Sequence, residues 1–206
     1  MPIKETVRYH FRSNLFKYVF LSAIFILGMI SGTYVVMRYD LNEVKDVTVF
    51  MDDFFKIFSQ GSVDYQAIFK TSILNMTKEF LMVWLLGFTV IGVLGIVLLV
   101  FRRGFLIGFV SAFFIKVYTA KGIGISLALF SAQAILYIPV LFILSIFAFE
   151  FSMLLLNMVT GKMKYKTDIK KFILFYTCVM ICAILIGCVY ALSETYIVPY
   201  LLKIIM

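Results

Sequence analysis

The side chains that could carry catalysis are few in this chain, and they do not form a known catalytic set. The one histidine, His10, lies beside arginines near the N-terminus. Asp52 and Asp53 are adjacent, so on a helix they would diverge by about 100° and could not act as a paired acid and base. The sequence contains no H-E-x-x-H motif and no P-loop. We therefore expect a protein that is not an enzyme and that needs no cofactor or metal.

Two other polar residues lie inside a long apolar run. Gln133 and Glu150 belong to residues 123–158, where Glu150 is the only charged residue and Pro139 lies near the midpoint. A broken membrane helix can form an ion or substrate site, and a carboxylate there is functional by default. One hypothesis is therefore a small transporter or permease subunit with its site at these residues. Against it, Glu150 is expected near the cytoplasmic end of the run, within reach of water or lysines.

The elements that must position these residues are five long apolar runs, at 17–37, 80–101, 104–118, 123–158 and 172–192. Hydrophobic residues make up 63% of the 206 residues, well above the roughly 45–50% of soluble proteins. A helix of about 20 apolar residues can cross a bilayer. We predict an all-α, polytopic integral membrane protein with about five transmembrane helices. The fourth should break near Pro139, because proline removes a helical hydrogen bond.

Basic residues gather at three places, and these predict the orientation in the membrane. The groups are Lys4, Arg8, Arg12 and Lys17; Arg102 and Arg103; and Lys162, Lys164, Lys166, Lys170 and Lys171. The positive-inside rule puts all three groups in the cytoplasm if the number of crossings is odd. The prediction is a cytoplasmic lead at 1–16, a cytoplasmic basic loop at 161–171 and an outer tail at 193–206. The net charge of +8 then reflects topology and not nucleic-acid binding.

Residues 38–79 form the predicted outer segment. At 100° per residue, residues 47–60 separate an apolar arc from a polar arc, which predicts an amphipathic helix. Asp64 is a suitable N-cap for a second helix that continues into the second span. The apolar arc either lies on the outer lipid headgroups or binds a partner in the same membrane. This candidate partner-binding surface consists of Phe50, Phe54, Phe55 and Phe58.

Glycines four residues apart indicate helix faces that pack closely. Gly28 and Gly32 lie in the first run, and Gly104 and Gly108 open the third. Small residues let helix backbones approach each other in lipid, where no hydrophobic effect drives helices together. We expect these faces to pack, and the sequence leaves open whether the protein also forms a homo-oligomer.

Several segments resemble one known family over nearly the whole chain. They are HFRSNLFKYVFLSAIFILGMISGTYVV, MVWLLGFTVIGVLGIVLLVFRRGFLIGF and AQAILYIPVLFI. Together with the outer segment, they resemble the stage II sporulation protein M family of spore-forming Firmicutes. The chain departs from the broader family in the fourth run, where Ala132, Gln133 and Ala134 replace a Pro-His-Gly run and Tyr137 replaces a Glu. We therefore expect this chain to lack the polar centre of that broader family.

The resemblance implies a multi-pass protein of the cell membrane that acts in engulfment, in the mother-cell membrane at the sporulation septum. It implies a non-enzymatic scaffold for peptidoglycan hydrolases that thin the septal wall. The implied partners are similar to stage II sporulation protein D, a lytic transglycosylase, and stage II sporulation protein P, an amidase and endopeptidase. Tethering would raise their local concentration at the membrane.

Overall fold

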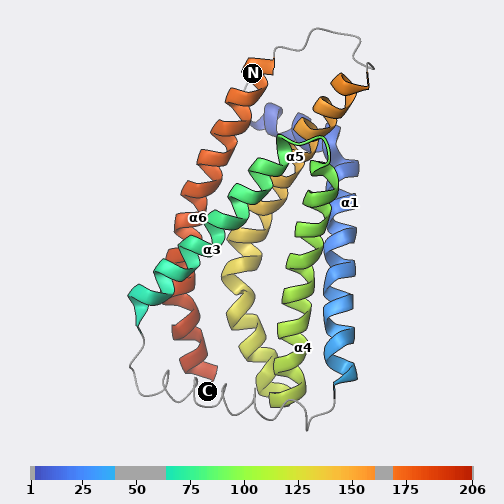
Figure 1. Cartoon of the computed structure of the whole chain (residues 1–206). Coiled ribbons are helices and arrows are strands. Elements are labelled where there is room, and N and C mark those ends of the chain that lie inside the picture. Colours follow the sequence, from blue (N-terminus) through green and yellow to red (C-terminus); the bar gives the residue numbers. More distant parts are fainter. Residues whose placement is uncertain (1–2, 40–63, 161–168, 206) are drawn as a thin grey trace.

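The computed structural model describes residues 3–39, 64–160 and 169–205, and every regular element within these ranges is a helix (Figure 1). The predicted all-α class is therefore confirmed for the described residues. The elements are α1 (Ile3–Arg38), α3 (Tyr65–Gly87), α4 (Gly92–Ala132), the π-helical turn η1 (Gln133–Tyr137), α5 (Ile138–Val159) and α6 (Ile169–Ile205).

Three helical stretches are long and apolar enough to cross a membrane: Asn14–Arg38, Gly92–Val159 and Ile169–Ile205. The second stretch is not one straight helix. Thr119 has φ 53° and ψ −119°, outside the helical region, and the chain doubles back there (Figure 1). The Ser126 hydroxyl on the returning part donates to the Ser111 carbonyl at 3.4 Å. Residues 92–118 and 120–159 thus form two antiparallel legs of the bundle.

The turn that precedes α4 lies earlier in the chain than the sequence predicted. The predicted spans 80–101 and 104–118 placed Arg102 and Arg103 between two helices. Instead α3 ends at Gly87, and α4 begins at Gly92 and runs through both arginines. Ser152 of α5 stabilises this turn, because its hydroxyl donates to the Thr89 carbonyl at 2.7 Å and accepts from the Val93 N–H at 3.2 Å. The two arginines are therefore not a topology signal at a helix end.

The predicted break at Pro139 is also corrected, because the helix continues through it. Just before Pro139, the Ile138 N–H donates to the Gln133 carbonyl, which is the wider i to i−5 bond of a π-helix. Proline has no N–H to offer the preceding turn, and the widened turn accommodates that loss without ending the helix.

Both ends of the predicted membrane domain are helical as well. Residues 3–16 of the lead are continuous with the first apolar run in α1. Residues 193–205, predicted as an outer tail in the interface, continue α6 through Pro199, and Val198 and Leu202 are buried. The predicted amphipathic helix at 47–60, with its Phe surface, lies outside the described residues. Asp64 caps α3 as predicted, accepting from the Gln66 N–H at 3.1 Å and the Ala67 N–H at 3.0 Å.

The main core lies between α3, α4, η1, α5 and α6, and α1 packs on the outside of α4. Aromatic rings fill much of this core: Phe80 stacks on Tyr137 with centroids 5.3 Å apart, and Phe151 stacks on Phe172 at 5.4 Å. The Tyr176 hydroxyl of α6 donates to the Trp84 carbonyl of α3 at 3.0 Å. These contacts fix α3 against α5 and α6, which is the arrangement that positions the site described next.

Candidate functional site

A carboxylate is buried in the interior of the bundle. Glu79 of α3 is only 5% exposed, and its helix neighbours Phe80 and Val83 belong to the apolar core. An unpaired charge in such a place would cost several kcal/mol, so a buried carboxylate depends on its partners. Thr71, Asn75 and Glu79 are spaced by four residues, so they lie on one face of α3.

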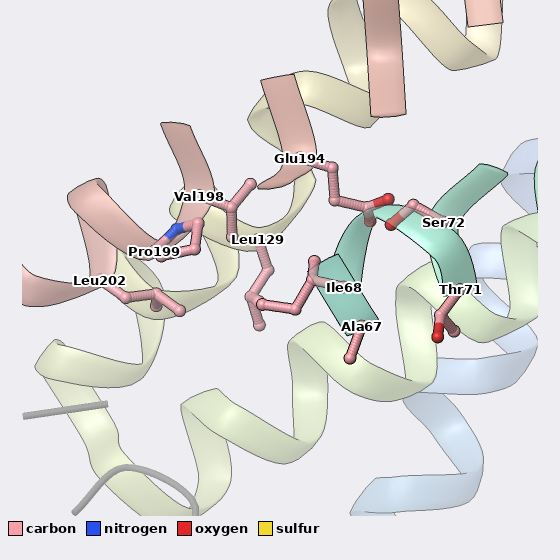
Figure 2. Close-up of a pocket in the computed structure, with 9 residues that line it drawn as sticks. All are labelled: Ala67, Ile68, Thr71, Ser72, Leu129, Glu194, Val198, Pro199 and Leu202. Atoms are coloured by element: carbon pink, nitrogen blue, oxygen red, sulfur yellow. The ribbon is translucent and has the colours of Figure 1, made fainter. Parts of the chain in front are cut away.

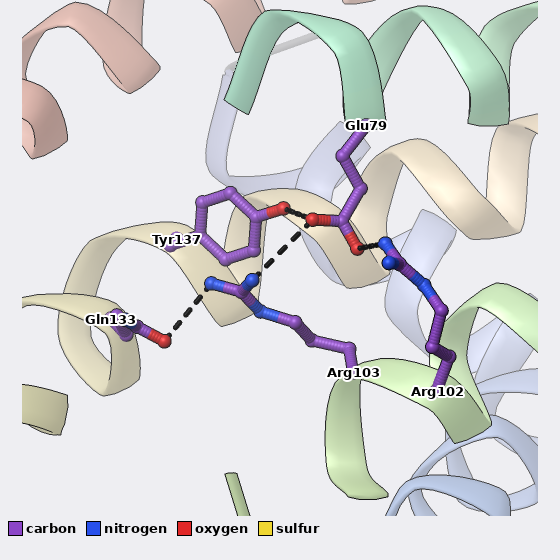
Figure 3. A network of polar contacts seen from close by, with 5 residues as sticks. All are labelled: Glu79, Arg102, Arg103, Gln133 and Tyr137. Carbon is purple, nitrogen blue, oxygen red and sulfur yellow. Dashed lines mark hydrogen bonds and ion pairs between the residues drawn. The ribbon is translucent and has the colours of Figure 1, made fainter. Parts of the chain in front are cut away.

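Three side chains from other elements bind Glu79 (Figure 3). Arg102 of α4 donates from Nη2 to Oε1 at 3.1 Å, and Nη1 of Arg103 lies 3.5 Å from Oε2. The Tyr137 hydroxyl of η1 donates a short hydrogen bond to Oε2. A single carboxylate thus joins α3 to α4 and to the π-helical turn.

Arg103 makes further contacts within this cluster. Its Nη2 donates to Oε1 of Gln133 at 2.9 Å, and its guanidinium carbon lies 4.2 Å from the centroid of the Tyr137 ring. A planar guanidinium can form a fork of hydrogen bonds and stack on an aromatic face at once, which a lysine ammonium cannot. Although adjacent in sequence, the two arginines differ in environment: the Arg103 side chain is 17% exposed and the Arg102 side chain is 51% exposed.

A polar cavity of about 280 Å³ lies beside the cluster. It is lined by Thr71, Ser72, Asn75, Met76, Glu79, Arg103, Gln133, Tyr137, Tyr190 and Glu194. A second pocket of about 370 Å³, lined mainly by apolar side chains, shares Thr71, Ser72 and Glu194 with the first. Figure 2 shows the Glu194 carboxylate of α6 pointing towards Ser72 of α3 at this shared boundary. The α3–α6 side of the cluster is therefore hollow, polar next to Glu79 and mainly apolar in the second pocket.

The structure separates the two residues of the hypothetical transport site. Gln133 belongs to the Glu79 cluster, whereas Glu150 accepts a hydrogen bond from Nζ of Lys17 at 2.9 Å. Lys17 also donates to Oδ1 of Asn14 at 2.8 Å. At 1.5 Å rise per residue, Gln133 and Glu150 are about 25 Å apart along the helix. Glu150 thus connects α5 to α1, and the structure does not bring it together with Gln133.

The four glycines singled out in the sequence lie in one interface, between α1 and α4. Gly28 and Gly32 of α1 lie directly against the α4 backbone, and Gly104 and Gly108 of α4 lie against the α1 backbone. A Cβ added at any of these glycines would clash with a backbone carbonyl oxygen of the other helix. Gly28 faces the Phe101 carbonyl and Gly32 the Phe105 carbonyl, while Gly104 faces the Phe25 carbonyl and Gly108 the Met29 carbonyl. Two of these carbonyls flank the arginine pair, so the close packing of α1 positions the part of α4 that binds Glu79.

The chain lacks the Pro-His-Gly run and the Glu expected of the broader family, but it has a polar cluster made of other residues. Gln133 and Tyr137, which stand where the broader family has other polar residues, take part in a polar cluster whose charges come from α3 and α4. The sequence interpretation missed this cluster because it placed Glu79 in the outer segment, just before the second span, and Arg102 and Arg103 between two spans. The sequence signal that could have revealed the cluster is the acidic Glu79 and the basic Arg102 and Arg103 in neighbouring apolar stretches.

The comparison with protein families identifies the chain. The family model described as Stage II sporulation protein M matches residues 21–199. The chain belongs to the stage II sporulation protein M family. The family match confirms the resemblance and covers all of α3, α4, η1 and α5, and hence the whole Glu79 cluster. The comparison with curated proteins gave no match, and neither did the comparison with solved structures. Membership implies a sporulation-related membrane protein.

Proposed function

We propose that the protein is a non-enzymatic membrane scaffold that recruits and anchors peptidoglycan hydrolases during engulfment in endospore formation. The observation that carries the proposal is the family match over residues 21–199. The proposed partners resemble stage II sporulation proteins D and P, and the proposed location is the mother-cell membrane at the septum. Holding both hydrolases at one membrane site raises their local concentration where the septal wall must be thinned.

The proposal includes five membrane crossings: α1, α3, the two legs of 92–159, and α6. Lys70, Lys78 and Glu79 lower the hydropathy of α3, which is not one of the three stretches named above as apolar enough to cross a membrane. Of these residues, Glu79 is neutralised inside the bundle, Lys70 lies near the start of the helix, and Lys78 is exposed. The start of α1 and the ends of α5 and α6 that flank residues 161–168 lie at one end of the bundle (Figure 1). The other end holds the C-terminus, the end of α1 and the start of α3. The lysines of 161–171 favour the first end as cytoplasmic, and residues 40–63 then face the wall.

The charged cluster supports a structural role for the bundle. Glu79 is held by two guanidinium groups and a hydroxyl, and Gln133 is held by Arg103. A carboxylate with these partners is poorly suited to bind and release a transported ion, because each release would leave buried charges unpaired. Such a cluster instead fixes α3 relative to α4. It thereby fixes the position of α3, which follows residues 40–63 in the chain.

Co-purification from membranes of sporulating cells tests the scaffold. Tagged wild-type protein should recover both hydrolases, and Phe54→Asp combined with Phe58→Asp should lose at least one while the protein still inserts. The matched control is Lys56→Asp combined with Gln60→Asp, which adds two carboxylates to the polar arc and should keep both partners. Unchanged recovery with the Phe variant would remove that surface from the proposal. Recovery of neither hydrolase with the wild type would remove the scaffold.

A second function, transport of a small solute, is favoured by the polar cavity of about 280 Å³ beside Glu79. Because Glu150 is bound to Lys17, such a site would use Gln133 with Asn75 and Glu194. Ser72→Leu would place an apolar side chain in the mouth shared by the two pockets. The scaffold proposal expects this variant to sporulate at wild-type levels, whereas a sporulation defect in a correctly inserted variant would favour transport.

A further inference from the structure

Arg102 presents a positive charge on the apolar surface of the bundle. It lies within α4, about 15 Å from the start of the helix at Gly92 at 1.5 Å per residue. Its side chain is 51% exposed, and it donates to Glu79 through Nη2 alone. Within the described part of the chain, its remaining guanidinium N–H groups have no partner. A guanidinium at such depth in lipid is unfavourable unless its charge is paired and its N–H groups are bound.

The Glu79 cluster satisfies only part of the hydrogen-bonding capacity of Arg102. One carboxylate serves both Arg102 and Arg103, and Gln133 and Tyr137 contribute hydrogen bonds without a charge. Glu194 lines the cavity on the Arg103 side of the cluster, and Arg102 does not line that cavity. Glu79 therefore pairs with the charge of Arg102 but leaves its other guanidinium N–H groups without a described partner on the surface side of the cluster.

An apolar groove of about 460 Å³ ends at this arginine. It runs between α3 and α4 and is lined by Met82, Leu85, Leu86, Thr89, Gly95, Leu98, Leu99 and Arg102, which we call the Arg102 groove. Leu85 is 54% exposed and Leu98 is 66% exposed. The groove also contains the small residues Thr89 and Gly95, which let another helix approach closely. Its one charged residue lies where an acidic side chain on that helix could reach it.

We propose that the Arg102 groove binds a membrane-spanning helix of a partner protein, and that an Asp or Glu of this helix pairs with Arg102. The proposal rests on the scaffold function and names the surface that holds a partner within the membrane. A guanidinium that already uses one edge for Glu79 can form a second charge-assisted pair with its free edge. The second pair would satisfy the guanidinium N–H groups of Arg102 that Glu79 leaves free.

Two other occupants fit the groove less well. A lipid phosphate stays at the interface, above the depth of Arg102, whereas a helix can carry a carboxylate at any depth. A second copy of this chain offers no suitable acid among the side chains that the structure describes. Glu79 is buried, Glu150 is bound to Lys17, Glu194 lies beside the cavity, and Asp64 caps the start of α3. The observations therefore favour a different protein with an acidic residue in an apolar segment.

Site-specific photocrosslinking in membranes of sporulating cells tests this proposal with the full-length protein. A photoreactive residue at Leu98 should give a protein adduct whose crosslinked peptide is an apolar segment containing Asp or Glu. The control position is Leu127, which is 69% exposed and lies on the returning leg, away from the groove residues. Leu127 should give lipid adducts.

Changing the arginine provides the second arm. Arg102→Leu should reduce the adduct at least tenfold, and Arg102→Lys should retain a substantial part of it, because only the lysine keeps the charge. The folded state should survive in both variants, since Arg103 and Tyr137 still bind Glu79, and a melting temperature close to wild type verifies this. Lipid adducts alone, a partner segment without an acidic residue, a second copy of this chain, or an adduct insensitive to Arg102→Leu would each overturn the proposal.

The crosslinking experiment and the co-purification experiment can fail independently of each other. If both hydrolases co-purify with the wild type while Leu98 yields only lipid adducts, the groove proposal fails and the scaffold stands. If Leu98 captures an acidic membrane helix that belongs to neither hydrolase, the groove proposal stands and the hydrolase partnership fails.

Discussion

Glu79 links more of the bundle than its single charge suggests, because two guanidinium groups and a hydroxyl depend on it. Without its carboxylate, the 17%-exposed Arg103 would lose its ion pair and keep neutral partners such as Gln133 and the Tyr137 ring. Breaking one side of a buried ion pair is more costly than the pair's own net contribution to stability, since it leaves the other charge desolvated.

Glu79→Gln should therefore lower the free energy of unfolding by about 3–5 kcal/mol. Thermal unfolding of the purified protein in detergent would measure the change. Glu150→Gln is the matched control, because its pair with Lys17 is partly exposed, and we expect a loss of about 1 kcal/mol or less. Equal losses in the two variants would contradict the central role given to Glu79.

Tyr137→Phe isolates one contact of the same cluster. It removes the hydroxyl that donates to Glu79 but keeps the ring beside Arg103 and the stack with Phe80. We expect a loss of about 1–2 kcal/mol in the same unfolding measurement, clearly less than for Glu79→Gln. A loss as large as that of Glu79→Gln would mean that the hydroxyl, and not the charge pairing, dominates the cluster.

At the scale of elements, α1 and α4 approach so closely that backbone faces backbone. The carbonyl oxygens across the interface leave no room for a Cβ at the four glycines, and Thr33 adds a hydrogen bond to the Gly108 carbonyl at 3.3 Å. Backbone cannot move aside as a side-chain tip can. The interface therefore depends on glycine itself and not merely on a small residue.

Gly28→Ala should separate α1 from α4 and destabilise the protein by about 1–3 kcal/mol in detergent. Gly124→Ala is the matched control, because an added Cβ there meets only side-chain atoms of Ile205, the nearest at 3.0 Å. The control should unfold within a degree or two of the wild type. A Gly28→Ala protein as stable as that control would show that the two helices are not in such close contact.

The turn between α3 and α4 depends on a side chain from α5. Ser152→Ala removes the partner of both the Thr89 carbonyl and the Val93 N–H, so we expect a loss of about 1–3 kcal/mol in thermal unfolding. Ser131→Ala is the control, since that hydroxyl binds only the Ala128 carbonyl of its own helix. If both serine variants unfold alike, Ser152 does not stabilise the turn.

The same turn explains how far the sequence could predict the fold. Apolar run length and composition predicted the helical class, and residue type at Asp64 predicted its cap. Residues 88–91 contain no proline, glycine or acidic turn signal, and their partner Ser152 is remote in sequence. The arginine pair, in contrast, resembles the basic end of a span, so the boundary was placed there. Only tertiary contacts distinguish a buried charge cluster from a helix end.

At the scale of the whole molecule, the antiparallel arrangement of the helices determines which segments of the chain lie at each end of the bundle. The ends of α1 and α3 that flank residues 40–63 lie at the end of the bundle opposite to the ends of α5 and α6 that flank residues 161–168 (Figure 1). A scaffold for wall hydrolases requires residues 40–63 on the wall side of the membrane. The proposed scaffold role therefore depends on which side of the membrane residues 40–63 and residues 161–168 lie, more than on any single contact.

Sided cysteine labelling of protoplasts tests this requirement most directly. In a chain with Cys178, Cys182 and Cys188 replaced by alanine, single cysteines are introduced as Ser59→Cys and Lys164→Cys. We predict that a membrane-impermeant maleimide labels the Ser59→Cys protein in intact protoplasts and the Lys164→Cys protein only after lysis. Labelling of both positions from the same side, or protection of the Ser59→Cys protein until lysis, would contradict the account.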